Sequence, residues 1–249
     1  LGRPADYDRI LPIAAEFEVP VLVDAAESLG SRYGAVTCGS FGDAAVVSFN
    51  GNKIMTTSGG GALLTDDSRL AEYARFLSTQ AREPVAHYEH REIGFNYRLS
   101  NLLAALGRAQ LTRLDAMVDR RREIRRRYSD TIASVQGVSV FGNDNDHCDN
   151  AWLTAILVDE RRTGFSAAEL GAWLAEHDIE TRPLWKPMHL QPVFAEVPIY
   201  GGEVSERIFS TGLNLPSGSK MTDADIEHVI AIATAYFELR GAAVDGAAP

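Results

Sequence analysis

The sequence VVSFNGNKIMTTSGGG, residues 46–61, decides the fold that we expect. An apolar run at 44–49 is typical of a buried strand, and a second apolar run at 62–64 follows the three glycines. Lys53 therefore lies in a loop between two strands. A lysine in a partly desolvated site can form a Schiff base, whereas most lysines are simply solvated, so spacing alone leaves both interpretations open.

A second stretch, PVLVDAAES at 20–28, is an apolar run that ends in a carboxylate. It predicts a buried parallel strand with Asp24 at its carboxyl edge, where open α/β sheets bind ligands. A lysine and an aspartate at such an edge are the two groups that pyridoxal phosphate requires. The amine binds the aldehyde, and the carboxylate keeps the pyridine nitrogen protonated. A cap on the following helix remains the alternative role for Asp24.

Composition excludes several classes of protein. The chain has 249 residues, 45% of them hydrophobic, which is enough for a sizeable core in one or two domains. A net charge of −10 argues against a nucleic-acid binder, and no apolar run approaches the roughly 18 residues of a membrane span. Cys38 and Cys148 are too few for a disulfide framework, so we expect a reducing, cytoplasmic setting. His87 and His90 lack further ligands nearby, so no metal site is expected.

Three motifs follow one another along the chain: VDAAE at 23–27, SFNGNK at 48–53 with its glycines, and GFNYRLSN at 94–101. Together they resemble the DegT/DnrJ/EryC1/StrS family of nucleotide-sugar aminotransferases. A fourth motif, RPLWKPMHLQP at 182–192, is most similar to the members that aminate UDP-4-keto-6-deoxy-N-acetylhexosamines on the bacillosamine-type route. The resemblance covers almost the whole chain.

The resemblance implies an α/β protein of the fold-type I aminotransferase class. Such proteins depend on pyridoxal phosphate and have a mostly parallel sheet flanked by helices, plus a small C-terminal α+β domain. We expect the remaining part of the PLP-binding large domain at 1–116, the small domain at 117–240 and a flexible tail at 241–249. Family members carry a phosphate-binding turn and a ring-stacking aromatic residue before the aspartate motif, and neither can be placed in residues 1–23. We therefore expect that the N-terminal part of the large domain is missing and that this chain alone can be inactive.

The resemblance assigns roles to four residues of the cofactor site. Lys53 is the catalytic residue that binds the cofactor, and Asp24 contacts its pyridine nitrogen. Ser48 is a phosphate ligand by resemblance, although a satisfied hydroxyl at the end of a strand is the alternative. Glu27 stands where relatives contact the cofactor's phenolic side, often with Gln or His, so its role stays open.

The NYR turn implies a homodimer with shared active sites. In the family this turn reaches the partner's cofactor phosphate, so Asn96 is expected to complete the site of the partner subunit. Arg98 could instead form a salt bridge within its own subunit.

The proline-rich motif at 182–192 is expected to bind substrate. Cationic and aromatic groups on a rigid loop suit a diphosphate and a sugar ring. A structural loop at the domain junction is the alternative. The expected substrate-binding residues are Arg182, Trp185, Lys186 and His189.

The other elements follow from apolar spacing and capping residues. We expect helices over 7–17, 68–79, 100–114, 166–177 and 222–239, and strands over 138–141 and 151–158. The run RRREIRRRY at 120–128 is basic, yet its helical spacing leaves one apolar side with Ile124 and Tyr128. We interpret its arginines as the solvated face of an amphipathic helix. The polar sequence at 142–149 predicts a hairpin turn and not a calcium loop, because the central glycine and terminal glutamate are absent.

The predicted function is transamination in cell-surface polysaccharide or glycan biosynthesis. An amino group moves from glutamate through pyridoxal phosphate onto a 4-keto-6-deoxy nucleotide sugar of the UDP-N-acetyl type. Two alternatives remain: the same chemistry on a dTDP-keto sugar, and a truncated, non-catalytic homologue that binds a nucleotide sugar or a partner subunit.

Overall fold

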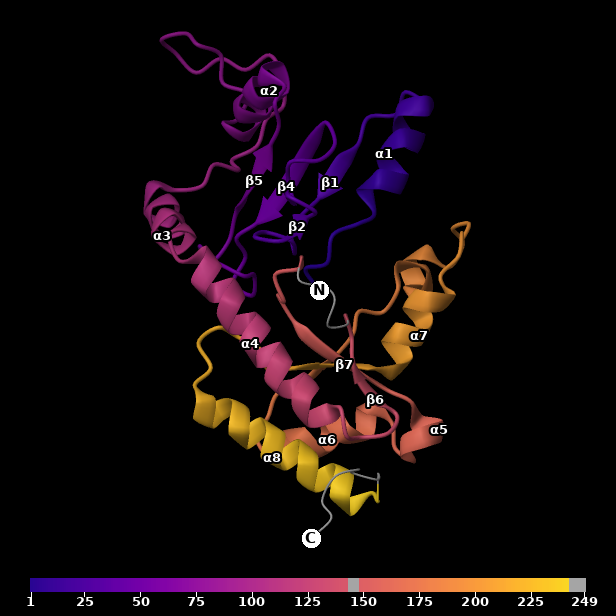
Figure 1. Ribbon diagram of the computed structural model, residues 1–249. Coiled ribbons are helices and arrows are strands. Elements are labelled where there is room, and N and C mark those ends of the chain that lie inside the picture. Colours follow the sequence, from indigo (N-terminus) through magenta and orange to yellow (C-terminus); the bar gives the residue numbers. More distant parts are fainter. Residues whose placement is uncertain (143–147, 242–249) are drawn as a thin grey trace. The chain divides into compact units, whose positions relative to one another are not determined.

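The computed structural model describes residues 1–142 and 148–241 (Figure 1). It divides into two compact units, and the first boundary falls between Asp119 and Arg120. The first unit also includes a later segment that ends at Trp152, so the chain returns to the first unit before it completes the second. Most of the predicted turn at 142–149 and of the predicted tail at 241–249 lies outside the described residues.

The first unit is built on a three-stranded sheet with the order β1-β4-β5 (Figure 1). β1 (Leu22–Asp24) is parallel to β4 (Ala44–Ser48), and β4 is antiparallel to β5 (Gly61–Leu64). The short strands β2 (Arg32–Tyr33) and β3 (Val36–Thr37) form a separate antiparallel pair. The helices are α1 (Tyr7–Glu16), α2 (Ser68–Ser78), α3 (Asn101–Leu111) and the first residues of α4 (Leu114–Ile132). The strands predicted on both sides of Lys53 are therefore present.

The apolar core of the first unit is small. Its cluster of buried residues comprises Tyr7, Val23, Ala25, Ala45 and Val47. Neither α2 nor α3 contains a buried residue. The apolar spacing that predicts the helix at 68–79 therefore does not mark a buried face, because the described residues do not cover that side of α2.

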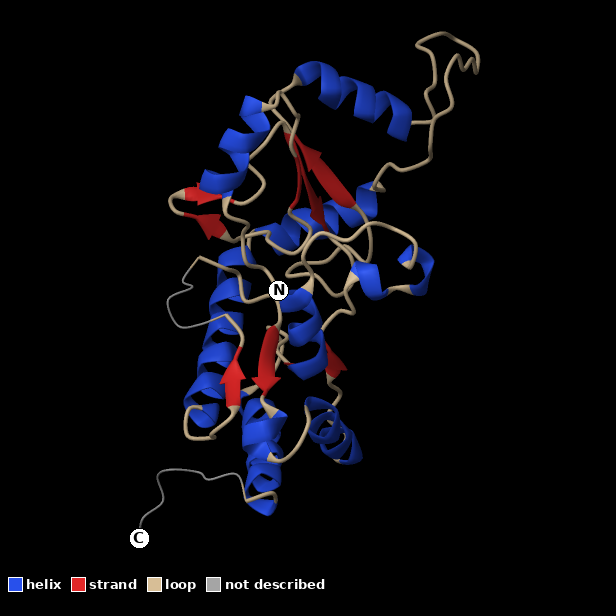
Figure 2. Ribbon diagram, turned by 90° about the vertical axis from the view of Figure 1, so that its right-hand side faces the viewer, coloured by secondary structure: helices blue, strands red, loops and turns tan. Residues whose placement is uncertain are grey.

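The second unit has a four-stranded antiparallel sheet with the order β6-β7-β9-β8. Figure 2 shows the strands of both units in red and the helices in blue. Its strands are β6 (Val138–Val140), β7 (Thr154–Val158), β8 (Arg182–Pro183) and β9 (Gly212–Leu215). Its helices, besides most of α4, are α5 (Glu160–Thr163), α6 (Ala167–Glu176), α7 (Glu203–Thr211) and α8 (Asp223–Leu239), with 3-10 turns η1 (Met188–Leu190) and η2 (Pro192–Phe194). Eighteen buried residues from these strands, helices and their connections form one core cluster.

Helix caps follow the sequence. Asp67 accepts hydrogen bonds from the first turn of α2. Ser166 and Thr222 each form a capping box with the residue three positions later, at the start of α6 and α8. These caps fix where the helices begin, so the predicted N-termini are correct within one or two residues.

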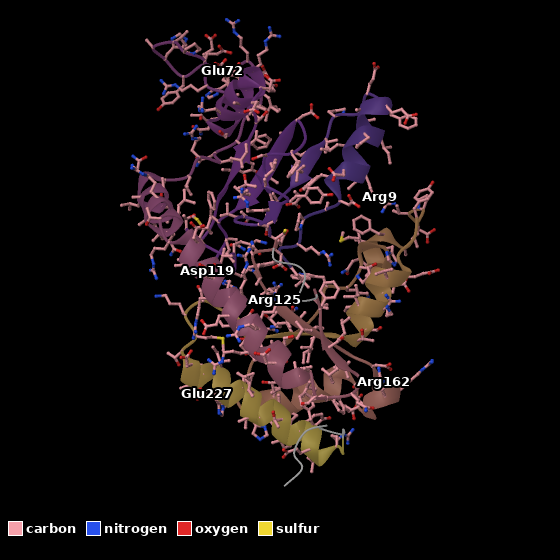
Figure 3. All side chains as sticks on the ribbon, in the orientation of Figure 1. Arg9, Glu72, Asp119, Arg125, Arg162 and Glu227 are labelled. Atoms are coloured by element: carbon pink, nitrogen blue, oxygen red, sulfur yellow. The ribbon has the colours of Figure 1, made fainter. Side chains whose placement is uncertain are left out.

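The arginines of α4 differ from the sequence interpretation. Ile124 and Tyr128 are buried as expected, but Arg121 is only 8% exposed and donates to the backbone oxygen of Ser217. Burial lowers the pKa of Arg121 to about 10. Arg127 pairs with Asp223 and Glu227 of α8, the latter labelled in Figure 3. The arginines are therefore not one solvated face, since α8 and the residues before it pack against that side of α4.

No helix within residues 1–142 and 148–241 is long and apolar enough to cross a membrane. The same part of the chain holds no group of three or more His, Cys, Asp or Glu side chains arranged to bind a metal ion.

Candidate active site

Lys53 lies in a tight loop that joins β4 to β5. The loop closes through backbone hydrogen bonds from Phe49 to Gly60 and from Thr57 to Phe49, both 2.9 Å. Gly60 has a φ of +89°, and a Cβ on Gly61 would lie 2.3 Å from the Val47 oxygen. These two positions therefore require glycine, whereas a Cβ on Gly51 or Gly59 would meet no atom within 4 Å.

The Lys53 side chain is held on two sides. Its ammonium forms an ion pair with Glu27, and it lies 4.2 Å from the centroid of the Trp152 ring. The lysine side chain is 12% exposed and the glutamate side chain 38% exposed. The exposed-turn interpretation of Lys53 is therefore wrong, and Glu27 is placed beside the amine.

Asp24 and Ser48 end two parallel strands. Because β1 and β4 are parallel, with Asp24 opposite Val46, their carboxyl ends lie at one edge of the sheet. One Asp24 oxygen accepts the backbone N–H of Ala26 at 3.0 Å, as in a local turn. The Ser48 hydroxyl accepts the backbone N–H of Asn50 at 3.3 Å.

A cavity of about 320 Å³ lies against the first unit beside Asp24. Residues that line it include Arg3, Tyr7 and Ser28. Lys53 and Ser48 are not among its lining residues. The structure thus brings Lys53 and Glu27 into contact and puts Asp24 and Ser48 at the same sheet edge.

Asn96 lies in a segment that pairs with the end of α2. It forms an isolated antiparallel bridge with Thr79, and Tyr97 donates its backbone N–H to Ser78 at 3.0 Å. Its side chain is exposed. Arg98 forms no ion pair with another residue of the described chain. The expected role of Asn96 in a partner's site stays a prediction.

The predicted substrate residues belong to the second unit. Arg182 lies on the edge strand β8 and pairs with Glu180. The His189 ring bonds the Glu206 carboxylate at 2.8 Å. A Cβ on Gly202 would lie 2.7 Å from the same ring, so the turn before α7 packs against the imidazole. Trp185 and Lys186 lie between Arg182 and His189 in the sequence, and both are exposed.

Comparison with known proteins then gives the family. Residues 1–234 match the DegT/DnrJ/EryC1/StrS aminotransferase family. The chain belongs to this family. The putative pyridoxal phosphate-dependent aminotransferase EpsN of Bacillus subtilis (strain 168) is 46% identical over 235 residues, which cover 93% of this chain and 60% of EpsN. The GDP-perosamine synthase of Escherichia coli O157:H7 is 34% identical over 228 residues, covering 92% of this chain and 61% of that protein.

A solved structure supports the same assignment. DesI, crystallised in the presence of its TDP-sugar product, is 29% identical and superposes with a TM-score of 0.84, covering 96% of this chain and 62% of DesI. The predicted family and fold-type I class are therefore confirmed, and the cofactor prediction is confirmed because the family depends on pyridoxal phosphate.

The chain spans about 60% of the length of the curated relatives that it matches. One relative is a GDP-perosamine synthase, and the product of another, DesI, is a TDP-sugar. The bacillosamine-type subgroup that the motif at 182–192 resembles therefore stays a prediction.

Sequence reasoning missed Trp152 in this member of the family. The residue was included in a predicted strand at 151–158, whereas β7 begins only at Thr154. Its Nε1–H donates to the Asn52 oxygen at 2.7 Å, across 100 positions of sequence. No local pattern marks such a contact. Asn150, which donates to the backbone oxygens of Glu27 and Leu29, was missed for the same reason.

Proposed function

We propose that this protein is a pyridoxal phosphate-dependent sugar aminotransferase that transfers an amino group from glutamate to a keto sugar carried by a nucleotide. The observation that carries the proposal is the placement of the Lys53 amine, which is 12% exposed beside Glu27 and Trp152. Family membership supports it. The names of the relatives support a sugar substrate.

The residues at the sheet edge fit the cofactor. An amine, a carboxylate and a hydroxyl are the groups that an aldehyde, a pyridinium N–H and a phosphate require. Asp24 uses one carboxylate oxygen for the Ala26 N–H, which leaves the other without a hydrogen bond to the described residues. The Ser48 hydroxyl can donate its proton, because its described bond uses the oxygen as acceptor.

Each residue then has a separate task. Lys53 holds the cofactor's aldehyde and later removes the proton from the α-carbon of the amino donor as general base. Asp24 stabilises the protonated ring nitrogen, and Ser48 donates to the phosphate. Glu27 accepts from the Lys53 amine while no carbonyl is attached to it. The cofactor, when bound, supplies the electron sink for the carbanion.

The finer parts of the proposal concern the substrate and the assembly. Arg182, Trp185, Lys186 and His189 would contact a UDP-linked 4-keto-6-deoxy-N-acetyl sugar, which is the substrate suggested by the motif at 182–192. Asn96 would reach the cofactor phosphate of a second copy in a homodimer. The same proposal places the enzyme in the cytoplasm, in polysaccharide or glycan biosynthesis.

Absorption spectroscopy tests the cofactor assignment. The purified protein with added pyridoxal phosphate should show the visible band of a lysine-bound cofactor, and excess glutamate should bleach it. Lys53→Ala should abolish the band and lower turnover by about 10²–10⁴-fold or more, because acid–base catalysis is lost. Lys220→Ala, at an exposed lysine in the second unit, is the matched control. A wild-type spectrum and rate in Lys53→Ala would refute the proposal.

A comparison of substrates tests the nucleotide. UDP-, GDP- and dTDP-linked 4-keto-6-deoxy sugars should be offered side by side to the same preparation, with and without an N-acetyl group. We expect the UDP-N-acetyl sugar to give the highest kcat/KM. A preference for another nucleotide would reject the subgroup and leave the aminotransferase proposal intact.

A further inference from the structure

Trp152 touches the Lys53 loop at two points. Its ring lies 4.2 Å from the Lys53 ammonium, and its Nε1–H donates to the backbone oxygen of Asn52 at 2.7 Å. The tryptophan is only 2% exposed. A cation over an aromatic face is more strongly attracted when water is excluded, so burial strengthens this contact.

The segment that carries Trp152 is fastened to the first unit by its backbone. We call residues 148–152 the strap. Arg32 donates its backbone N–H to the Cys148 oxygen at 2.7 Å, and Asn150 donates its backbone N–H to the Ser31 hydroxyl at 2.9 Å.

The Asn150 side chain links the strap to the segment that contains Glu27. Its side-chain N–H₂ donates to the backbone oxygens of Glu27 and Leu29, each at 2.8 Å. Its side-chain oxygen accepts the backbone N–H of Trp152 at 2.9 Å. The fully buried Asn150 amide thus fixes the backbone of both Glu27 and Trp152, the two residues that contact the Lys53 ammonium.

We propose that Trp152 is a positioning residue for Lys53: the indole ring holds the ammonium from one side, Glu27 holds it from another, and the indole N–H fixes the loop through Asn52. The significance for amino transfer rests on the proposed function, whereas the placement of the amine can be tested without cofactor. Glu27 alone leaves the long lysine side chain several rotamers, because a single ion pair at a partly exposed carboxylate orients it weakly.

Acylation of lysine amines in the cofactor-free protein tests the proposal. The sequence has three lysines, and Lys186 and Lys220 are exposed internal references. A water-soluble acylating reagent followed by peptide mass spectrometry should label Lys53 slowly in the wild type. In Trp152→Leu the Lys53 rate, relative to the two references, should rise by about tenfold.

Matched variants separate the ring from the bulk of the side chain. Trp152→Phe keeps an aromatic face and loses the bond to Asn52, so it should restore most of the protection. Trp173→Leu is the control, since Trp173 also donates to a backbone oxygen, that of Ile232, but lies in the second unit. An unchanged Lys53 rate in Trp152→Leu, or equal rates in the Leu and Phe variants, would overturn the proposal.

A second measurement leaves Trp152 in place, in case its removal prevents folding. In a Trp173→Phe, Trp185→Phe background, Trp152 is the one remaining tryptophan. Lys53→Met should then change the indole emission intensity and wavelength, whereas Lys220→Met should not. Identical emission in both would overturn the proposal. Failure of the proposed function would appear separately, as a wild-type protein that protects Lys53 but gives no visible band with pyridoxal phosphate.

Discussion

The two units contrast in how much apolar surface their elements bury. The second unit packs eighteen buried residues into one cluster, with Phe165, Leu170 and Leu174 fully buried. The first unit has five in its cluster, and its helices α2 and α3 bury none. The unit with the smaller core carries Lys53, Asp24 and Ser48. These three candidate site residues are therefore held by hydrogen bonds, glycine turns and an ion pair more than by a thick apolar core.

This contrast teaches what an amphipathic helix requires. The same sequence signals, an N-cap and an apolar stripe, form helices in both units. In the second unit the stripe of α6 is buried against the sheet and α8. In the first unit Leu102 of α3 is 84% exposed. Local signals thus decide that a helix forms, while its contribution to stability depends on what covers it.

The largest expected effect is the loss of unfolding free energy when a phenylalanine is replaced by alanine, and we compare this substitution in the two units. Phe165→Ala should lower the free energy of unfolding of the second unit by about 3–5 kcal/mol, because the ring is fully buried between Tyr236 and Phe237. Phe95→Ala in the first unit, at a residue that is 47% exposed, should cost less than about 1 kcal/mol. Urea unfolding followed by circular dichroism measures both, and equal losses would contradict the contrast.

Helix caps give the next effect. Ser166→Ala should destabilise the second unit by about 1 kcal/mol, since it removes half of a capping box on a helix with buried residues. Asp67→Ala removes the cap of α2, which has no buried residue, so it should only accelerate amide exchange within that helix. Hydrogen exchange with mass spectrometry distinguishes the two. A global change in exchange caused by Asp67→Ala would show that α2 is coupled to the rest of its unit.

The smallest effect is a pH dependence confined to the second unit. Tyr128 is buried and donates its hydroxyl to the Pro216 oxygen at 2.7 Å, and burial raises the pKa of Tyr128. Above pH about 10 the unfolded chain loses this proton while the folded chain keeps it. The unfolded state then binds fewer protons, so this contribution to stability is complete below pH 10 and decreases as the pH rises.

Tyr128→Phe tests the alkaline effect. It should lose about 1 kcal/mol at neutral pH, with the hydrogen bond, and show a flatter decrease of stability above pH about 10. Tyr88→Phe, at a side chain of the first unit that is 76% exposed, is the control. Thermal melts from pH 8 to about 11 measure the slopes; a steeper slope in Tyr128→Phe would reverse the sign of the argument.

The sequence predicted most of the local elements and the positions of two candidate site residues within them. Apolar spacing and caps located the helices, and the loop between β4 and β5 placed Lys53 as the structure has it. Asp24 was predicted at the end of an apolar strand, and it is the last residue of β1. These successes concern residues within about one element of each other, where spacing carries the information.

The remainder depends on long-range contacts that spacing does not record. Trp152 reaches Asn52 across 100 positions, and the buried Arg121 reaches Ser217 across 96. The sequence analysis assigned Trp152 to a strand and Arg121 to a solvated helix face. The return of the strap to the first unit is a matter of topology, which a periodic pattern cannot reveal.

The strap also sets an order of events during synthesis. Asn52 is made 100 residues before Trp152, which donates a hydrogen bond to its backbone oxygen. By then α4 and β6, which largely belong to the other unit, have already been translated. The first unit therefore cannot finish folding before the strap has been made. The ion pair of Lys53 with Glu27 needs only earlier residues, whereas its contact with Trp152 forms after part of the second unit has been made.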